Sequence, residues 1–242
     1  MTDERFAIYY SPAINSGLWT FGSHWLGRDA YSGDTLPRFE VKGVEQALLD
    51  RVTASPRHYG FHATLKPPFR LKPECSRDEL VDAISDFAAT RQAFEMPRLV
   101  LADLVGFLAL RPDGSCSRLK ALAAECVEHF DRFRRAPSEV ELEKRLGQGL
   151  RPEQRRMLER WGYPYVMDEF RFHLTLTGRI GAGLRDHLRR VLNARVSSLS
   201  EVTLEMDALT LFHQSDPEQP FRVIHRSPLA RESGGGLQFA AG

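Results

Sequence analysis

One five-residue pattern occurs twice in this 242-residue chain, at two positions far apart. Residues 61–65 read Phe-His-Ala-Thr-Leu, and residues 172–176 read Phe-His-Leu-Thr-Leu. On a β-strand alternate side chains share a face, so each His lies beside its Thr while Phe and Leu point to the opposite side. A helix would not keep residues two apart on one face. The repeat therefore favours a fold with two similar strands, each burying an apolar face and turning a polar face to a groove.

The rest of the chain alternates between strand and helix patterns. A capping-box signature, Ser76 to Glu79, indicates a helix start, whereas glycines between residues 17 and 33 indicate turns, and Pro56 is expected to end a helix. We expect helices over 43–52, from 76, from 117 and over 182–194, and strands over 6–10, 57–65, 98–101, 105–110, 170–177, 201–212 and 221–225. This order predicts an α+β fold with two similar halves.

Two segments differ from this pattern. Residues 136–165 are rich in Glu and Arg and predict a pair of short helices around Gly147-Gln-Gly149. They form either a solvated insertion or a lid with substrate contacts. The Gly-rich end, 230–242, is expected to be disordered. We therefore expect a single bilobal domain over 1–229.

Composition excludes several classes of protein. Lys plus Arg total 33 against 32 Asp plus Glu, so the net charge is +1. This balance makes extended nucleic acid an improbable partner, although a local basic cleft stays open. No apolar run approaches the roughly 20 residues of a membrane span, and no signal peptide is recognisable. Three cysteines without a C-x-x-C pair predict reduced thiols, so we expect a soluble, cytoplasmic protein with no membrane partner.

Two His-Thr pairs in one groove would suit transfer at phosphorus. A neutral imidazole can deprotonate water while an imidazolium protonates the leaving alkoxide, and His62 and His173 are the candidates for these roles. Thr64 and Thr175, with Thr177 on the same face, would donate hydrogen bonds to phosphoryl oxygens. This chemistry requires no metal, and we expect no cofactor.

Other residues near the motifs are candidates for substrate binding. Lys66 and Arg171 fall where they could reach the groove and neutralise phosphate, although each could equally be a surface cation. Three tyrosines could stack on a sugar or base or pack in the core. The candidate set is Tyr9, Arg57, Tyr59, Lys66, Tyr163 and Arg171. A metal on His58 and His62 is disfavoured, because Pro56 and Gly60 oppose a helix there.

The two motifs resemble those of the 2H phosphoesterase superfamily, the LigT-like cyclic phosphodiesterases, which carry two His-x-Thr/Ser-hydrophobic motifs. His62 with Thr64 and His173 with Thr175 match them residue by residue. The resemblance implies two pseudo-symmetric lobes, each an antiparallel sheet backed by helices, around a central groove. It also implies metal-independent hydrolysis of a cyclic phosphodiester, typically a 2′,3′-cyclic nucleotide or an RNA end.

The run from Arg57 to Pro68 and the charged segment more narrowly resemble a branch that is often encoded beside phosphonate-utilisation genes. That context implies a phosphoribosyl cyclic phosphate as substrate. The alternatives are an RNA-end or nucleotide-binding module, and an RNA end-joining ligase that uses the same groove. The sequence leaves open which histidine is the base, the leaving group and the oligomeric state.

Overall fold

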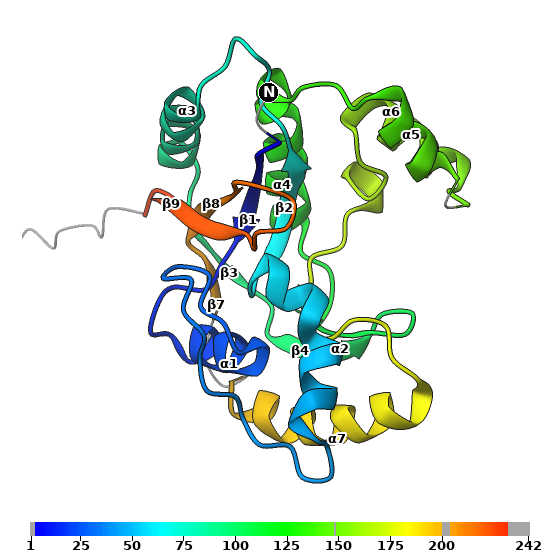
Figure 1. Ribbon diagram of the computed structural model, residues 1–242. Helices are drawn as coiled ribbons and strands as arrows, with labels where there is room; N and C mark the ends of the chain where they lie inside the picture. The colour runs from blue at the N-terminus through cyan, green and yellow to red at the C-terminus, as the bar shows by residue number, and fades with distance from the viewer. Residues whose placement is uncertain (1–2, 148, 200–203, 232–242) are drawn as a thin grey trace, which may run out of the picture.

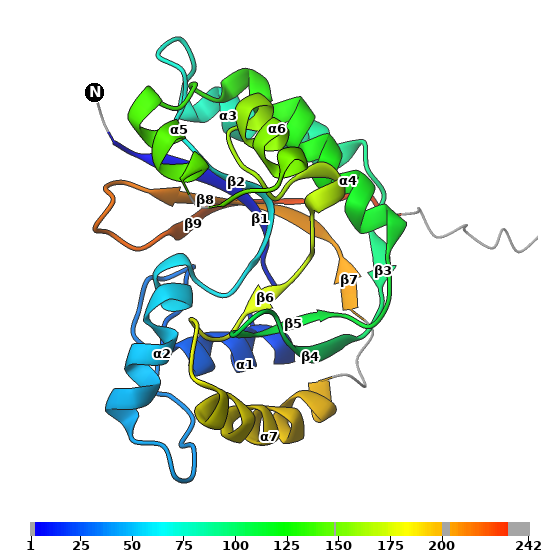
Figure 2. The ribbon, with the colours of Figure 1, turned by 90° about the vertical axis from the view of Figure 1, so that its right-hand side faces the viewer.

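The computed structural model describes residues 3–147, 149–199 and 204–231. Its first strand, β1 (Arg5–Tyr10), is an interior strand of an antiparallel sheet ordered β2-β1-β8-β9. The other strands are β2 (Ala63–Phe69), β8 (Ala208–Gln214) and β9 (Arg222–Pro228). One face carries Phe6 and Ile8 into the main core, where α3 (Arg77–Ala89) and α4 (Ser117–His129) cover it (Figure 2).

A second antiparallel sheet, ordered β4-β5-β6, forms the other lobe. It consists of β4 (Leu99–Asp103), β5 (Leu108–Pro112) and β6 (Leu174–Thr175), and α7 (Ala182–Leu199) packs on β4. Helices α1 (Gly17–Leu26) and α2 (Gln46–Tyr59) pack on each other in the same lobe, and the ribbon of β3 (Phe94–Met96) and β7 (Leu204–Met206) lies between the sheets (Figure 2). The two-lobed α+β fold expected from the sequence is confirmed.

Two expectations for the first half of the chain are wrong. A helix, α1, occupies part of the stretch expected to be loops, and α2 continues past Pro56 to Tyr59. Proline has no N–H to give to the carbonyl one turn earlier. That carbonyl, of Val52, instead accepts a hydrogen bond from Gly178 at 2.7 Å. The helix that leads into the first motif is thereby joined to the chain just after the second.

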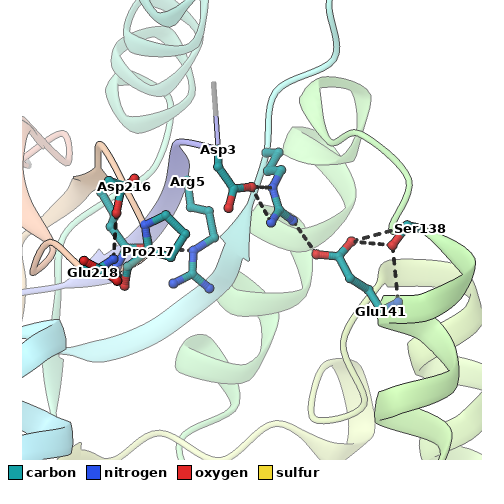
Figure 3. A network of polar contacts seen from close by, with 9 residues as sticks. Asp3, Arg5, Ser138, Glu141, Asp216, Pro217 and Glu218 are labelled. Atoms are coloured by element: carbon teal, nitrogen blue, oxygen red, sulfur yellow. Dashed lines mark hydrogen bonds and ion pairs between the residues drawn. The ribbon is translucent and has the colours of Figure 1, made fainter. Parts of the chain in front are cut away.

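The charged segment 136–165 contains two short helices, as expected: α5 (Glu139–Leu146) and α6 (Pro152–Trp161). They project to one side of the molecule (Figure 1). Arg70, at the end of β2, connects this segment to the N-terminal chain, because its guanidinium pairs with both Asp3 and Glu141 at 2.6 Å (Figure 3). Short 3₁₀ turns, Phe130–Phe133 and Met167–Glu169, precede and follow the segment.

The disorder expected from residue 230 is not present at Ala230 itself. Ala230 exchanges backbone hydrogen bonds with Arg91 and Ala93, so the ordered chain extends through this residue. Residues 232–242 lie outside the described part. The three cysteines are free thiols. None of the helices in the described ranges combines the length and apolarity that crossing a bilayer requires.

Candidate active site

Both motif histidines stand one residue before a strand at the edge of a sheet. His62 precedes β2, and His173 precedes β6. The alternation expected from the sequence is present in both copies, because the His and Thr side chains are half-buried while the intervening residues are buried. The buried set is Phe61, Ala63, Leu65, Phe172, Leu174 and Leu176.

The two imidazoles make equivalent hydrogen bonds. Nδ1 of His62 lies 2.9 Å from the carbonyl oxygen of Gly60, and Nδ1 of His173 lies 2.8 Å from that of Arg171. A carbonyl oxygen only accepts, so each Nδ1 carries the proton. In the neutral rings Nε2 is therefore the atom with a free lone pair.

The hydrogen bond from His62 to the carbonyl oxygen of Gly60 depends on an unusual backbone conformation at Gly60. Its φ of 85° lies in the left-handed region, and a Cβ there would stand 2.7 Å from Cβ of Ala30. Glycine alone adopts this conformation without strain and leaves that space empty. The residue that ends α2 thus also orients the first motif histidine.

Each histidine has a lowered pKa, and the charge of His173 contributes to the shift at His62. Burial lowers the pKa of His62 to about 4; the hydrogen bond to Gly60 acts in the opposite direction, and the charge of His173 lowers it further. Burial also lowers the pKa of His173, against the effect of the Arg171 carbonyl. Both imidazoles are therefore neutral at pH 7, and a positive charge on His173 would act on His62.

The motif threonines lie beside the histidines. Oγ1 of Thr64 is 3.4 Å from Nε2 of His62. Thr175 pairs across the sheet with Ala109, and within the described residues its hydroxyl has no hydrogen-bond partner. Thr177 departs from the expected groove face: it is fully buried, and its hydroxyl accepts a hydrogen bond from the backbone of Leu108.

Aromatic rings surround His62 and form what we call the aromatic wall: Tyr9, Tyr59, Tyr163, Phe212 and Phe221. Tyr9 stacks on His62 with ring centres 3.8 Å apart, and Tyr59 and Phe212 lie at 6.2 and 5.9 Å. The pKa of Tyr9 is raised by burial and then by the neighbouring phenols of Tyr59 and Tyr163. Tyr163, which follows α6, is therefore brought to the wall by the charged segment.

Lys66 lies apart from this group, contrary to the sequence expectation. Its side chain is 2% exposed and directed toward α4. Nζ donates to the carbonyl oxygen of Val127 at 3.0 Å and pairs with Asp131 at 3.3 Å. Its pKa is lowered to about 8, because burial outweighs the attraction of Asp131.

A bulge in β2 explains this orientation. Tyr9 pairs with Thr64, but the preceding residue of β1, Ile8, pairs with Lys66, so Leu65 is an extra residue in the ladder. Paired residues of antiparallel strands project to the same face. Lys66 therefore follows Ile8 into the core instead of following Thr64 into the groove, as bulges commonly redirect side chains.

The two arginines that the sequence predicts as substrate-binding residues lie in different surroundings. Arg57 is half-buried and forms an ion pair with Asp50 at 3.4 Å. The side chain of Arg171 is exposed, and the residue contacts the site through its backbone carbonyl, which accepts the hydrogen bond from His173. Neither guanidinium is hydrogen-bonded to a motif histidine.

Sequence reasoning missed three residues of the site. Phe107, in the turn between β4 and β5, lies 5.9 Å from His173 between ring centres. Arg28 is 7% exposed and donates to the carbonyl oxygens of residues 57, 58 and 221, which fixes the turn before the first motif. Gln214 is fully buried and contacts His58. All three come from segments with no recognisable motif, so only tertiary contacts reveal them.

The described residues contain no group of three or more His, Cys, Asp or Glu side chains arranged to hold a metal ion. His58, which the sequence places four residues before His62, contacts Gln214: Nε2 of His58 lies 2.9 Å from the amide nitrogen of Gln214.

Residues 64–222 match a protein family described as "Protein of unknown function (DUF1045)". The chain belongs to this family. The match to DUF1045 begins at Thr64 and includes the whole second motif.

Two curated relatives of this DUF1045 chain are called ribose 1,5-bisphosphate phosphokinase PhnN. The relative from Janthinobacterium sp. (strain Marseille) is 35% identical over 230 residues, which cover 93% of this chain and 51% of the relative. The relative from Laribacter hongkongensis (strain HLHK9) is 38% identical over 176 residues, which cover 73% of this chain and 40% of the relative. The DUF1045 chain thus spans about half the length of these relatives, or less.

A crystal structure of a conserved protein of unknown function from Agrobacterium tumefaciens strain C58 is also similar. It aligns with a TM-score of 0.44 at 13% identity and covers 93% of this chain and 85% of that chain.

Proposed function

We propose that this protein is a metal-independent phosphodiesterase of the 2H phosphoesterase type, which opens a small cyclic phosphate ester with water. One observation carries the proposal. The two motif histidines have the same tautomer, which makes Nε2 the basic atom of each ring, and the charge of His173 lowers the pKa of His62. Two such imidazoles at one site are what general acid–base catalysis at phosphorus requires.

The two pKa shifts suggest which histidine has which role. His62 has a pKa of about 4 and is neutral over the wider pH range, so we assign it as the general base. His173 would be the acid, since an anionic ester bound beside it favours the protonated imidazole. A bound anion would thus favour the protonated imidazole that the acid role requires.

The chemical step balances with these two groups. Nε2 of His62 takes a proton from water, the oxygen attacks phosphorus, and the ring P–O bond breaks. Nε2–H of His173 gives its proton to the departing alkoxide. The products are a phosphate monoester and a hydroxyl, and solvent returns the two rings to their starting states. Thr64 and Thr175 would donate to the non-bridging oxygens as charge develops there.

The names of the two relatives support a phosphorylated ribose as the substrate class. Their printed name concerns ribose 1,5-bisphosphate, which fits the phosphoribosyl cyclic phosphate expected for the phosphonate-associated branch. We do not extend the kinase activity to this chain, because it spans only part of those proteins and contains no G-x-x-x-x-G-K-[ST] segment.

A 2′,3′-cyclic nucleotide is the second candidate substrate. The aromatic wall favours it, because Tyr59 and Tyr163 are half-buried rings on which a base could stack. The same wall would also serve a nucleotide-binding module without turnover.

The experiment is a ³¹P NMR assay of the purified chain with ribose 1,2-cyclic phosphate 5-phosphate, 2′,3′-cyclic AMP and a linear diester, each with EDTA. We expect a cyclic ester to become a monoester at an unchanged rate with chelator. Loss of activity in EDTA would favour a metal mechanism, and tight binding without a new resonance would favour the binding module.

A further inference from the structure

Three nitrogen-bearing side chains lie next to Phe221 of the aromatic wall; we call Arg5, Arg28 and His58 the cationic corner. Arg5 shares a face of β1 with Tyr9, because alternate residues of a strand point the same way. Its guanidinium carbon lies 5.4 Å from the ring centre of Phe221. Phe221 in turn stacks on Tyr59 at 5.2 Å, and Tyr59 lies next to His62. The corner is thus connected to the first motif through two rings.

A buried amide holds two members of the corner in place. Oε1 of Gln214 accepts a hydrogen bond from Nε of Arg5 at 2.6 Å, and its Nε2 donates to Nε2 of His58 at 2.9 Å. Because Nε2 of His58 accepts, the ring proton is on Nδ1. Both side chains keep donors that no described residue uses: Nδ1–H of His58 and the terminal nitrogens of Arg5.

Arg5 has no ion-paired carboxylate. Within the described ranges no carboxylate lies at ion-pair distance from its guanidinium, which points away from Asp3, and Asp3 pairs with Arg70 (Figure 3). Arg28 is more than nine-tenths buried, and its Nη1 has no hydrogen-bond partner, although the adjacent carboxylate of Asp29 partly compensates its charge. A half-buried cation without an ion pair, such as Arg5, attracts an anion.

The pKa of His58 reflects the positive charge of the two arginines as well as burial. Its pKa is lowered, first by burial and then by the charges of Arg28 and Arg5. A bound anion would reverse the effect of the two arginines on the imidazole.

We propose that Arg5 and His58 bind a second anionic group of the substrate, a phosphate monoester outside the ring that is hydrolysed, with Arg28 contributing buried positive charge. The inference rests on the proposed function and narrows its substrate class to sugar or nucleoside cyclic phosphates with a further phosphate. The planar guanidinium of Arg5, fixed at Nε, leaves the two terminal nitrogens for a bidentate contact with phosphate oxygens. The scissile phosphate would lie at the histidines, with the sugar along Tyr59.

The test compares kcat/KM for ribose 1,2-cyclic phosphate with and without a 5-phosphate. We expect wild type to prefer the phosphorylated substrate by about 10- to 100-fold, the range that hydrogen bonds to a charged group supply. Arg5→Gln should remove most of this preference, while Arg77→Gln, a matched change on α3 behind the other face of the sheet, should keep it. An equal loss for both substrates in Arg5→Gln would overturn the inference.

A binding measurement separates this inference from the proposed function. Calorimetric titration with ribose 5-phosphate and with ribose needs no turnover. Tighter binding of ribose 5-phosphate to wild type, lost in Arg5→Gln, supports the corner even if no cyclic ester is hydrolysed. If cyclic esters are hydrolysed with no preference for the extra phosphate, the phosphate-binding role of the cationic corner is rejected. The proposed phosphodiesterase activity is then still supported.

Discussion

The imidazoles of His62 and His173 each donate Nδ1–H to the carbonyl oxygen two residues earlier in the chain, at 2.9 and 2.8 Å. The strands that follow belong to different sheets. The two motifs therefore share a side-chain hydrogen bond as well as a sequence, and in both the basic atom of the ring is Nε2.

The pH dependence of turnover should reflect the two lowered pKa values. With His62 as base, kcat/KM should fall as pH decreases through about 4, where this ring becomes protonated. With His173 as acid, it should also fall as pH rises through a value below 6.5, because the pKa of His173 is lowered. We expect a maximum between these limits in a pH–rate profile measured at low substrate. A profile with both limbs above 6.5 would contradict the assignment.

The lowered pKa of His62 also predicts that the folded protein becomes less stable as pH falls. The folded pKa of His62 lies below its unfolded value, so the unfolded chain binds a proton first as pH falls. Between pH 6.5 and about 4 the protein should therefore lose about 3 kcal/mol of unfolding free energy through this residue. Urea unfolding should show a smaller loss for His62→Gln, which cannot titrate. If the unfolding free energy of the variant depends on pH as that of the wild type does, burial does not lower the pKa of His62.

The sequence predicted those elements whose signals are local. The capping box at Ser76 and Glu79 starts α3 as expected, with both reciprocal hydrogen bonds present. The alternating motif residues likewise divide between buried and half-buried positions.

Elements decided by tertiary contacts were missed. The glycine pattern predicts a turn at Gly22, but this residue lies inside α1, where a Cβ would stand 1.9 Å from the ring of Phe61. The glycine is there for close packing against the first motif. Pro56 is tolerated in α2 because Gly178 uses the carbonyl that proline cannot. The orientation of Lys66 depends on a bulge, which a regular alternation does not predict.

Lys66→Met tests that orientation. The substitution replaces a buried ammonium with an apolar chain, and Asp131 keeps its ion pair with Arg134 at 2.6 Å. We expect a loss of about 1–2 kcal/mol of unfolding free energy, measured in urea. KM for the cyclic ester should stay at the wild-type value. A folded variant with a raised KM would instead place the ammonium in contact with substrate.

The charged segment should influence substrate binding through Tyr163. Glu141→Gln removes the ion pair with Arg70, yet glutamine at this position can still complete the capping box with Ser138. We expect KM to rise while kcat changes little. Loss of the ion pair would weaken the hold on the segment that carries Tyr163 of the aromatic wall, whereas the two histidines keep their hydrogen bonds. Glu153→Gln is the matched control, since Glu153 pairs only locally with Arg156 on the exposed face of α6. If both substitutions change KM equally, the charged segment 136–165 has no specific role in substrate binding.

The central claim is that two distant histidines act on one phosphate ester, and single-turnover rates of His62→Ala, His173→Ala and the double variant test it most directly. Each single change should lower the rate by about 10²–10⁴-fold, and the double variant should be little slower than the worse single one, since the groups act as a unit. Thermal unfolding would verify that all three variants are folded. A folded single variant with the wild-type rate would contradict the account.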